Sequence, residues 1–460
     1  SSWPKCSLIH AQMAEPPKVV SHAKTGWWGM QKRRAKTLWL ATSVYRQVQS
    51  CRKRTKGMPK EASVQEWLQF HETVARQIRV HIEENKGLLI KACQFLSARP
   101  DILPEAYIRE FSLLTDQLPE SPMEEIRRVL RADLRRPIRE VFQEFQTPSI
   151  GSASIAQVHR AVLHSGETVA VKVQHEGVDR LIKEDLGTLE IIVNQVAKRE
   201  PNFDLRPLLQ ELRTTHPREL DFLAEREALE RAREALGRFG SPVIVPRTHG
   251  ALCARRVLTM EFIEALPLLS FSNAALRAEH NLDSRLLVDT IVDAFGIMIF
   301  RDGFFHADPH PGNFLLQPQP DTQAGAVPVL LDFGLVRVLT PKDKLNLART
   351  IDAMASGDLP ALFAALGRLG YKLDKSAFSK EKRQELMEFA ASLKGKGQDR
   401  KPLPRIVEDW PGLVVTVLRA VSSLEGLAIT LAANANMQRI VGRFAKHARA
   451  ALAESPPSKL

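Results

Sequence analysis

The chain has 460 residues, of which 44% are apolar and 26% are charged, so it is long enough for one two-lobed domain or for two domains. It holds no run of eighteen apolar residues, which excludes a simple transmembrane helix. The formal net charge of +12 is uneven, because residues 1–60 hold thirteen Lys and Arg against one acid, whereas the remainder holds 52 of each sign.

The cysteines form no C-x-x-C pair and are scattered along the chain: Cys6, Cys51, Cys93 and Cys253. This spacing predicts reduced thiols in a protein that is not secreted. The chain begins with Ser, which indicates a processed mature protein or a fragment.

Residues 1–26 show no periodicity, whereas residues 27–56 mix aromatic and apolar side chains with many Lys and Arg. The second pattern predicts a basic amphipathic helix at a membrane interface, and the alternative is a helix packed on the body. The basic residues 1–60 suit an anionic lipid surface or an acidic partner. A solvated arm or a remnant of organelle targeting would have the same composition.

Gly and Pro breaks separate the helices that are predicted next, at about 63–84, 87–98, 104–117 and 122–134. All of them precede the first nucleotide-binding pattern, so residues 61–147 are predicted to form a helical extension.

The sequence pattern changes at residues 148–174, where the nucleotide-binding motifs begin. Residues 151–158 are in register with the kinase glycine-rich loop, G-x-G-x-x-G-x-V, although Ala153 and Ala156 replace two glycines. The residues predicted to line the nucleotide here are Gly151, Ser152, Ala153, Ser154 and Val158. Lys172 then ends a V-A-I-K-like strand, and such a lysine binds the α- and β-phosphates. The order and spacing favour this interpretation over an ordinary hairpin with a surface lysine.

Two helical stretches follow, at about 178–199 and 205–236. A kinase needs a glutamate to pair with its strand lysine, and Glu225 or Glu219 could serve. The strand at 257–262 fits the hinge that holds adenine by its backbone, at Met260 and Glu261.

The chemical centre is predicted at residues 305–313 and 330–334. Asp308 and Asn313 have the spacing of a kinase catalytic loop, H-R-D-x-x-x-x-N, and Asp332 begins a D-F-G. In this pattern Asp308 is the catalytic carboxylate, and Asn313 and Asp332 are the ligands of Mg²⁺ bound with ATP. An apolar helix at 282–301 is predicted to lead into this loop, and mostly helical structure fills residues 266–460, with a linker at about 393–402.

An alternation of His306, Asp308 and His310 raises a second possibility, a metal site built on a strand. Pro309, Pro311 and Gly312 argue for a loop instead, and no Cys lies nearby. The histidines are therefore interpreted as groups that fix the loop.

These motifs together resemble the UbiB/aarF-domain atypical kinases, a family tied to isoprenoid-quinone and lipid metabolism. The resemblance covers roughly residues 60–450, and the stretch from Asn85 to His175 resembles the branch of the mitochondrial aarF-domain kinase 1. It implies that Glu225 is the ion-pair partner of Lys172 and that Glu219 and Asp221 form the family's E-x-D element.

The same resemblance implies a regulatory cover. The family's K-x-G-Q element lies in a helical extension that folds over the active site and restricts large substrates. Here Lys91 and Gln94 match that element, but Cys93 stands where the family has glycine, which puts the standard regulation in doubt.

The predicted fold is an α+β, two-lobed, protein-kinase-like fold with a helical N-terminal extension and a mostly helical large lobe. The predicted divisions are a basic segment at 1–60, the extension at 61–147, a kinase-like N-lobe with inserted helices at 148–265, and a helical C-lobe at 266–460.

The predicted function is that of an ATP-dependent kinase or ATPase acting on a small-molecule or lipid-like substrate at an organelle membrane. The alternative is a nucleotide-binding scaffold within a membrane protein complex, with little turnover. An ordinary protein kinase is disfavoured because no A-P-E element follows the D-F-G. An anionic membrane surface is an expected partner and nucleic acid is not.

The expected location is a mitochondrion, then a plastid. A C-terminal Ser458-Lys459-Leu460 would be a peroxisomal address if it is the true, exposed end of the protein.

Overall fold

The computed structural model describes residues 27–85, 87–97, 103–114, 120–201, 203–307, 309–370, 412–433 and 437–454, together with residues 384 and 388. The chain divides into two compact units. The first holds residues 1–223 and 249–260, and the second holds residues 224–248 and 261–460. The predicted N-terminal tail, the linker at 393–402 and the C-terminal tripeptide lie outside the described residues.

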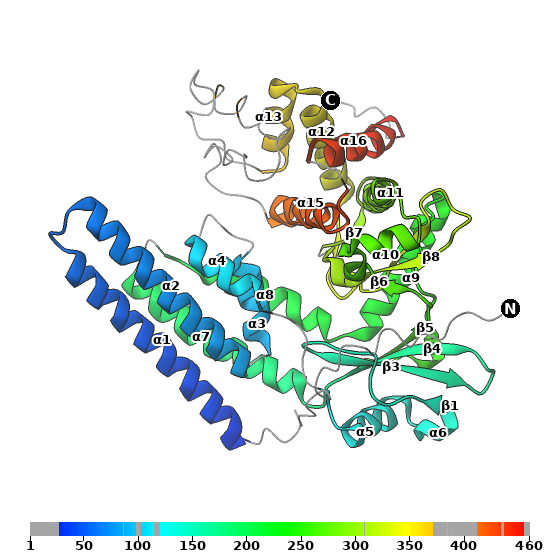
Figure 1. Cartoon of the computed structure of the whole chain (residues 1–460), viewed down its shortest axis with the longest axis horizontal. Coiled ribbons are helices and arrows are strands. Elements are labelled where there is room, and N and C mark those ends of the chain that lie inside the picture. Colours follow the sequence, from blue (N-terminus) through cyan, green and yellow to red (C-terminus); the bar gives the residue numbers. More distant parts are fainter. Residues whose placement is uncertain are drawn as a thin grey trace. The chain divides into compact units, whose positions relative to one another are not determined.

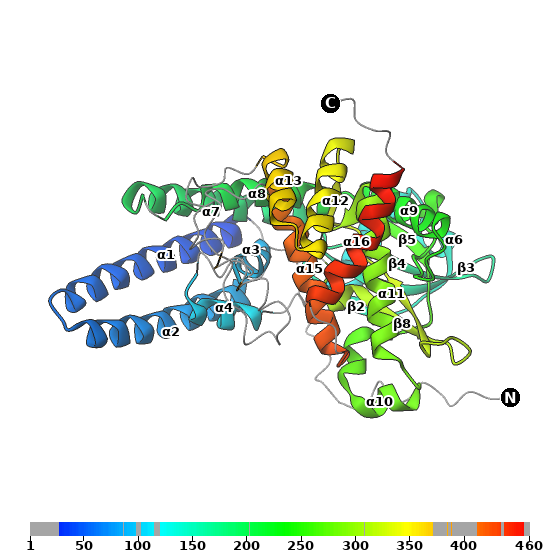
Figure 2. The same cartoon turned by 90° about the horizontal axis from the view of Figure 1, so that it is seen from above.

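The first unit contains the helices α1 (Trp27–Thr55), α2 (Lys60–Asn85), α3 (Leu88–Ser97), α4 (Glu105–Ser112), α5 (Met123–Leu134), α6 (Ile138–Val141), α7 (Val178–Arg199) and α8 (Arg206–Glu219). Figures 1 and 2 show α1 and α2, in blue, as a long antiparallel hairpin with α7 alongside α1. Gly57 closes the hairpin with φ +89°, a backbone conformation that glycine adopts without strain. The four helices predicted for the extension are thus present, but the one predicted at 104–117 ends at Ser112.

Two apolar clusters hold these helices together. Cys51 of α1 packs with Phe70 and Val74 of α2, and the one-turn spacing of the last two places them on one face. A second cluster joins α2, α3 and α4 around Ile82, Ile90, Cys93 and Phe111.

A five-stranded antiparallel sheet completes the first unit. Its strands are β1 (Phe142–Phe145), β2 (Gly151–Ser152), β3 (Ala156–Leu163), β4 (Thr168–Gln174) and β5 (Val257–Glu261). Their order is β1-β3-β4-β5, with β2 paired to β3. The alternating Val169, Val171 and Val173 of β4 are buried against α5. Lys172 lies between them in sequence, so its side chain leaves from the other face of the strand.

The expectation of one helical stretch at 205–236 is wrong. The structure has two helices, α8 and α9 (Phe222–Arg238), with a break at Leu220 and Asp221. Backbone groups at the break bond elsewhere: Phe222 N donates to Arg255 O at 3.0 Å, and Leu220 O accepts from Gln174 Nε2 at 2.8 Å. These bonds come from Gln174 of β4 and from Arg255 in the turn before β5, both distant in sequence, so helical periodicity alone could not reveal the break.

The second unit holds most of α9 and the later elements. Its strands are β6 (Leu266–Pro267), β7 (Phe304–His306), β8 (Phe314–Pro318), β9 (Ala326–Leu330) and β10 (Val336–Val338). They form a three-stranded sheet, β6-β8-β9, and a two-stranded one, β7-β10. Its longer helices are α10 (Ala274–Glu279), α11 (Ser284–Gly296), α12 (Pro341–Ser356), α13 (Leu359–Arg368), α15 (Gly412–Thr430) and α16 (Met437–Ala453).

The apolar helix predicted at 282–301 is present as α11, which continues into the π-helical turn η3 (Ile297–Asp302) before β7. Helix α16, in red, lies against α11 and α12 (Figure 2). The mixture of antiparallel sheets and many helices confirms the α+β class. Within the described residues, no helix is both long enough and apolar enough to cross a bilayer.

Candidate active site

The predicted nucleotide loop is the turn that joins β2 to β3. Gly151 pairs with Val158, and Ala153 N donates to Ala156 O at 2.8 Å, which closes the turn tightly. Val158 in turn lies opposite Lys172 on β4. The register therefore brings together the loop and the lysine that the sequence predicted to share a nucleotide.

A buried histidine, which none of the sequence motifs singled out, fixes this turn. The backbone N of His175 donates to Ile155 O at 2.9 Å, and its ring Nε2 lies 3.0 Å from Ala153 O. The ring Nδ1 lies 2.8 Å from Ser121 Oγ. If Nε2 carries the proton, the ring donates to Ala153 and accepts from Ser121, so every polar ring atom is used. The one signal in the sequence was its position directly after the lysine strand.

Lys172 lies beside an aromatic ring at the start of α9. Its Nζ is 5.0 Å from the centroid of Phe222, within the range of a cation–π contact. Phe222 is fully buried, so this contact limits where the lysine head group can lie.

Two members of the predicted regulatory cover meet in the first unit. Lys91 Nζ of α3 forms an ion pair with Glu219 Oε2 at the end of α8. The carboxylate is the more buried partner, with a side chain 10% exposed. Gln94 lies one turn further along α3, and its side chain is outside the described part of the structure.

Cys93, which stands where the family has glycine, is buried. Its side chain is 7% exposed and packs into the cluster that joins α2, α3 and α4. The position that is glycine in the family therefore carries a thiol that fills space between helices.

Asp221, the second acid of the E-x-D element, begins α9. Its Oδ1 accepts from Leu223 N at 3.1 Å, a bond typical of a residue that caps a helix N-terminus. Part of the role of this acid is thus structural.

At the predicted hinge, the side chain of Met260 is buried. The backbone N–H of Glu261 already donates to Arg247 O at 2.8 Å, within the second unit. Any backbone contact of Glu261 with a purine would therefore use its carbonyl.

In the second unit, two antiparallel strand pairs bracket the predicted catalytic loop. Strand β7 pairs with β10, where His306 lies opposite Val336, and Ala307 N donates to Leu335 O at 2.9 Å. Strand β8 pairs with β9, where Phe314 lies opposite Leu330. Asp308 lies outside the described residues, but both of its flanks are held by strands.

The pairing of β8 with β9 places Asn313 next to the D-F-G segment. Leu331 N donates to Asn313 O at 3.1 Å, so Asn313 lies beside the residue that directly precedes Asp332. Asp332 Oδ1 accepts from Gly334 N at 2.7 Å, which orients the carboxylate. A carboxylate and an amide oxygen are ligands that suit Mg²⁺, so this pair fits the ion that the motif implies.

His306 contacts the D-F-G phenylalanine, and His310 bonds within the loop. His306 is buried, and its ring meets Phe333 edge-to-face at a centroid distance of 5.5 Å. Phe304 stacks on Phe333 at 6.2 Å. His310 Nδ1 accepts from Gly312 N at 3.1 Å, which shapes the turn before Asn313.

Glu225 also lies at this segment. It is 3% exposed, and a Cβ built on Gly334 would lie 4.0 Å from its Oε2 and 3.2 Å from Asp332 Oδ1. The glutamate that the resemblance pairs with Lys172 is therefore beside the D-F-G within the second unit. Because Lys172 belongs to the first unit, the Lys172–Glu225 pair stays a prediction.

A lysine strand next to an alanine-rich turn, and a catalytic loop bracketed with a D-F-G, define a protein-kinase-like protein. The chain belongs to the ABC1 atypical kinase-like domain family, whose model matches residues 113–365. The predicted family and fold are thereby confirmed.

Relatives and solved structures agree with this assignment. The chain is 37% identical over 310 residues to "AarF domain-containing protein kinase 1" of Mus musculus, covering 67% of this chain and 58% of the relative. It is 32% identical over 288 residues to "Probable protein kinase UbiB" of Marinobacter nauticus, covering 61% of this chain and 51% of the relative. The structure of Mycobacterium tuberculosis Rv3197 with erythromycin matches with a TM-score of 0.55 and 25% identity, over 81% of this chain and 95% of that one. The chain thus spans less than three-fifths of the length of these two curated relatives.

Proposed function

We propose that this chain is an atypical kinase or ATPase that uses Mg-ATP on a small-molecule or lipid-like substrate. The observation that carries the proposal is the juxtaposition of Asn313 with the Asp332 segment, which the β8–β9 hairpin holds together. Kinase-named relatives support a phosphotransferase. The family resemblance supports a role in isoprenoid-quinone or lipid homeostasis at an organelle membrane.

Each residue has a distinct part in this proposal. Lys172 contacts the α- and β-phosphates, and Glu225 orients the lysine. Asn313 and Asp332 hold Mg²⁺, which when bound would offset the charge of the phosphates. Asp308 orients the acceptor hydroxyl, or a water molecule, and takes its proton.

The test separates binding from turnover. Asp332→Asn removes a charge from the metal ligand and should weaken magnesium-dependent ATP binding, measured by calorimetry. Asp308→Asn should bind Mg-ATP almost normally and lose turnover by a factor on the order of 10²–10⁴, the usual contribution of a general base. Unchanged magnesium-dependent affinity in Asp332→Asn would refute the site assignment.

Substrate class is tested on the same proteins. Wild-type turnover should rise with membrane lipid or a quinone-precursor-like phenol, and generic proteins should not be phosphorylated. Broad phosphorylation of proteins would contradict the small-substrate proposal.

A nucleotide-binding scaffold is the second candidate function. It is favoured by the packing of Cys93, which fills the position of the family glycine and joins α3 to α2 and α4. Nucleotide binding by the wild type without turnover under any of these conditions would favour the scaffold.

For location we propose a mitochondrial membrane, on the support of the family resemblance. A plastid and a peroxisome are the alternatives, and imaging of the full-length protein with its C-terminus left untagged distinguishes them.

A further inference from the structure

Helix α1 is strongly basic and two of its faces are occupied by the body of the first unit. It carries eight Lys and Arg and no acid. Arg33 pairs with Asp185 of α7 through two bonds of 2.8 Å, and Arg52 pairs with Glu200 after α7 at 2.6 and 2.8 Å. Arg54 pairs with Glu66 of α2.

Other cations of α1 behave differently. Five of them form no ion pair within the part of the chain that the structure describes: Lys32, Arg34, Lys36, Arg46 and Lys53. Arg34 is half-buried and the other four are exposed, whereas Arg33 is largely buried against Asp185. The helix therefore divides its cations between those that hold it to the unit and those that face solvent.

Two tryptophans share the solvent-facing side. Trp28 is 79% exposed and Trp39 is 71% exposed. Both are unusual, because burial of the large indole ring releases more free energy than burial of most side chains. At 100° per residue, the two indoles and the four exposed cations fall within about 100° of one another around the helix. They form one stripe that runs for about 38 Å along α1.

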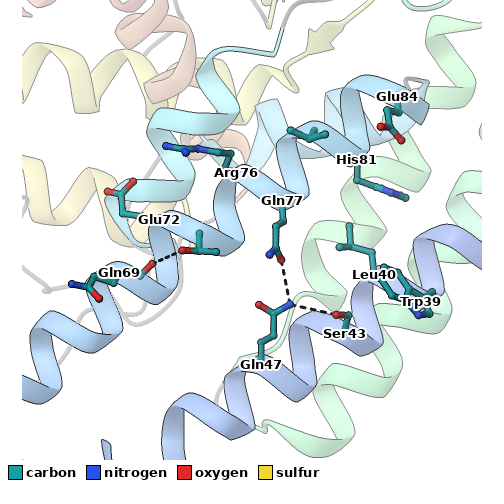
Figure 3. Close-up of a pocket in the computed structure, with 12 residues that line it drawn as sticks. Trp39, Leu40, Ser43, Gln47, Gln69, Glu72, Arg76, Gln77, His81 and Glu84 are labelled. Atoms are coloured by element: carbon teal, nitrogen blue, oxygen red, sulfur yellow. Dashed lines mark hydrogen bonds between the residues drawn. The ribbon is translucent and has the colours of Figure 1, made fainter. Parts of the chain in front are cut away.

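The groove beside this stripe is a weaker candidate. It lies between α1 and α2, has a volume of about 880 Å³, and Trp39 stands at its edge (Figure 3). The residues that line it include Glu72 and Glu84, and Gln47 Nε2 donates across it to Gln77 Oε1 at 3.2 Å. Two carboxylates would repel an anionic head group.

We propose that the stripe of Trp28, Lys32, Lys36, Trp39, Arg46 and Lys53 is a docking surface for an anionic lipid bilayer. The cations meet the lipid phosphates, and the indoles enter the head-group region, where their apolar rings and N–H groups are both satisfied. The long Lys and Arg stems allow the charges to reach the phosphates while the helix lies flat. This proposal concerns α1 alone and does not rest on the proposed catalytic function.

The first test is co-sedimentation of the full chain with vesicles of phosphatidylcholine, with and without phosphatidylglycerol. Wild type should bind only the anionic vesicles, and binding should fall as salt rises. Changing Lys32, Lys36, Arg46 and Lys53 to Gln should weaken partitioning on the order of 10²–10³-fold, since each charge near such a surface contributes about fivefold.

A matched control removes the same charge elsewhere on the first unit. Arg127, Arg131, Arg136 and Arg180 are exposed residues off α1, and their change to Gln should leave binding within about threefold of wild type. Equal loss in this control would show that net charge alone drives binding and would overturn the proposal. Circular dichroism checks that both variants keep the wild-type helix content.

The second test asks whether the indoles enter the bilayer. Brominated phosphatidylcholine in the anionic vesicles should quench tryptophan fluorescence of wild type, and a Trp28→Ala, Trp39→Ala variant should lose most of the quenching and bind at least about tenfold more weakly. Undiminished quenching in that variant would overturn the proposal. Binding to polyglutamate but not to vesicles would also overturn it, because the surface would then fit an acidic polypeptide.

Discussion

At the scale of single residues, the fold decides what each polar or reactive side chain can do. Lys91 and Lys172 are both lysines of the first unit, but one pairs with Glu219 and the other lies over the ring of Phe222. Cys93 shows the same dependence, because its burial among α2, α3 and α4 raises the pKa of its thiol to about 12.

Cys93 should therefore react slowly. A thiol with this pKa has little thiolate at neutral pH, and thiolate is the form that is alkylated. We expect iodoacetamide to modify Cys93 at least about 100-fold more slowly in the native protein than in denaturant, with or without ATP. Peptide mass spectrometry over time measures both rates, and similar rates would show that the helix cluster is not packed around this residue.

Lys172 and Glu225 should act as one unit in nucleotide binding. Lys172→Met and Glu225→Gln should each lower Mg-ATP affinity by roughly tenfold, and the double variant should lose less than the sum of the two free-energy changes. Calorimetric titration of the four proteins gives the coupling. Additive losses would mean that a glutamate other than Glu225 pairs with the lysine.

At the scale of elements, charged clamps fasten helices that are distant in sequence. In the first unit, Asp185 of α7 is 4% exposed and accepts from Arg33 of α1 and from Leu88 N at the start of α3. In the second unit, Asp289 and Asp293 of α11 bind Arg439 and Arg443 of α16. Both clamps join helices about 100 or more residues apart.

Gly87 tests the first clamp. Its φ is +70°, and an added Cβ would lie 2.9 Å from Asp185 Oδ2 and 3.0 Å from Arg33 Nη2. Gly166 also has a positive φ, +86°, but nothing within 4 Å of an added Cβ, so it is a matched control for backbone strain. Gly166→Ala should cost about 1–2 kcal/mol of unfolding free energy, and Gly87→Ala should cost at least about 1 kcal/mol more.

Denaturant unfolding followed by circular dichroism measures the two free-energy changes. Equal changes in the two variants would show that the Arg33–Asp185 contact has room for a methyl group.

Asp293 tests the second clamp through pH. Burial opposes its charge, but hydrogen bonds from His447 and Arg443 outweigh that effect and hold its pKa below the usual value. A carboxyl with a lowered folded-state pKa stabilises the fold above its unfolded pKa and loses that contribution as pH falls through the folded value. The free energy of unfolding should therefore fall as the pH drops below about 4.

Asp293→Asn should lower stability at neutral pH by about 1.5–3 kcal/mol and weaken this acid dependence. Asp352→Asn is the control, because Asp352 of α12 accepts from Arg449 of α16 at the surface and should matter little. Unfolding curves from neutral pH to pH 3 compare the variants, and an unchanged acid dependence in Asp293→Asn would assign the effect to other carboxyls.

At the scale of the whole molecule, the predicted catalytic residues are divided between two compact units. Lys172 belongs to the first and Asn313, Asp332 and Glu225 to the second. If residues of both units bind one nucleotide, the ligand should stabilise both.

Saturating Mg-ATP should therefore raise the melting temperature of every transition seen by calorimetry. Ligand at 100 times its Kd adds about 2.7 kcal/mol to the stability of a protein that binds it only when folded. ATP with EDTA, and Asp332→Asn with Mg-ATP, should give smaller shifts. A shift confined to one of two resolved transitions would mean that one unit alone binds the nucleotide.

The sequence by itself determined the class of this protein and the helices of the N-terminal extension, together with the strand that carries Lys172. Motifs such as the D-F-G and the V-A-I-K-like strand are local, and helix and strand periodicities are local too, so neither needs knowledge of the fold. The alternation of valines in β4, for example, predicts its buried face and the opposite placement of Lys172.

Only the tertiary structure decided which distant groups meet. The break between α8 and α9 depends on Arg255 and Gln174, and Lys91 pairs with Glu219 across 128 residues of sequence. The sequence showed that α1 is basic, but not that Arg33 is paired and largely buried while Arg46 is exposed. The physical reason is that a side chain's charge is local information, whereas its partners and its exposure depend on which elements pack against it.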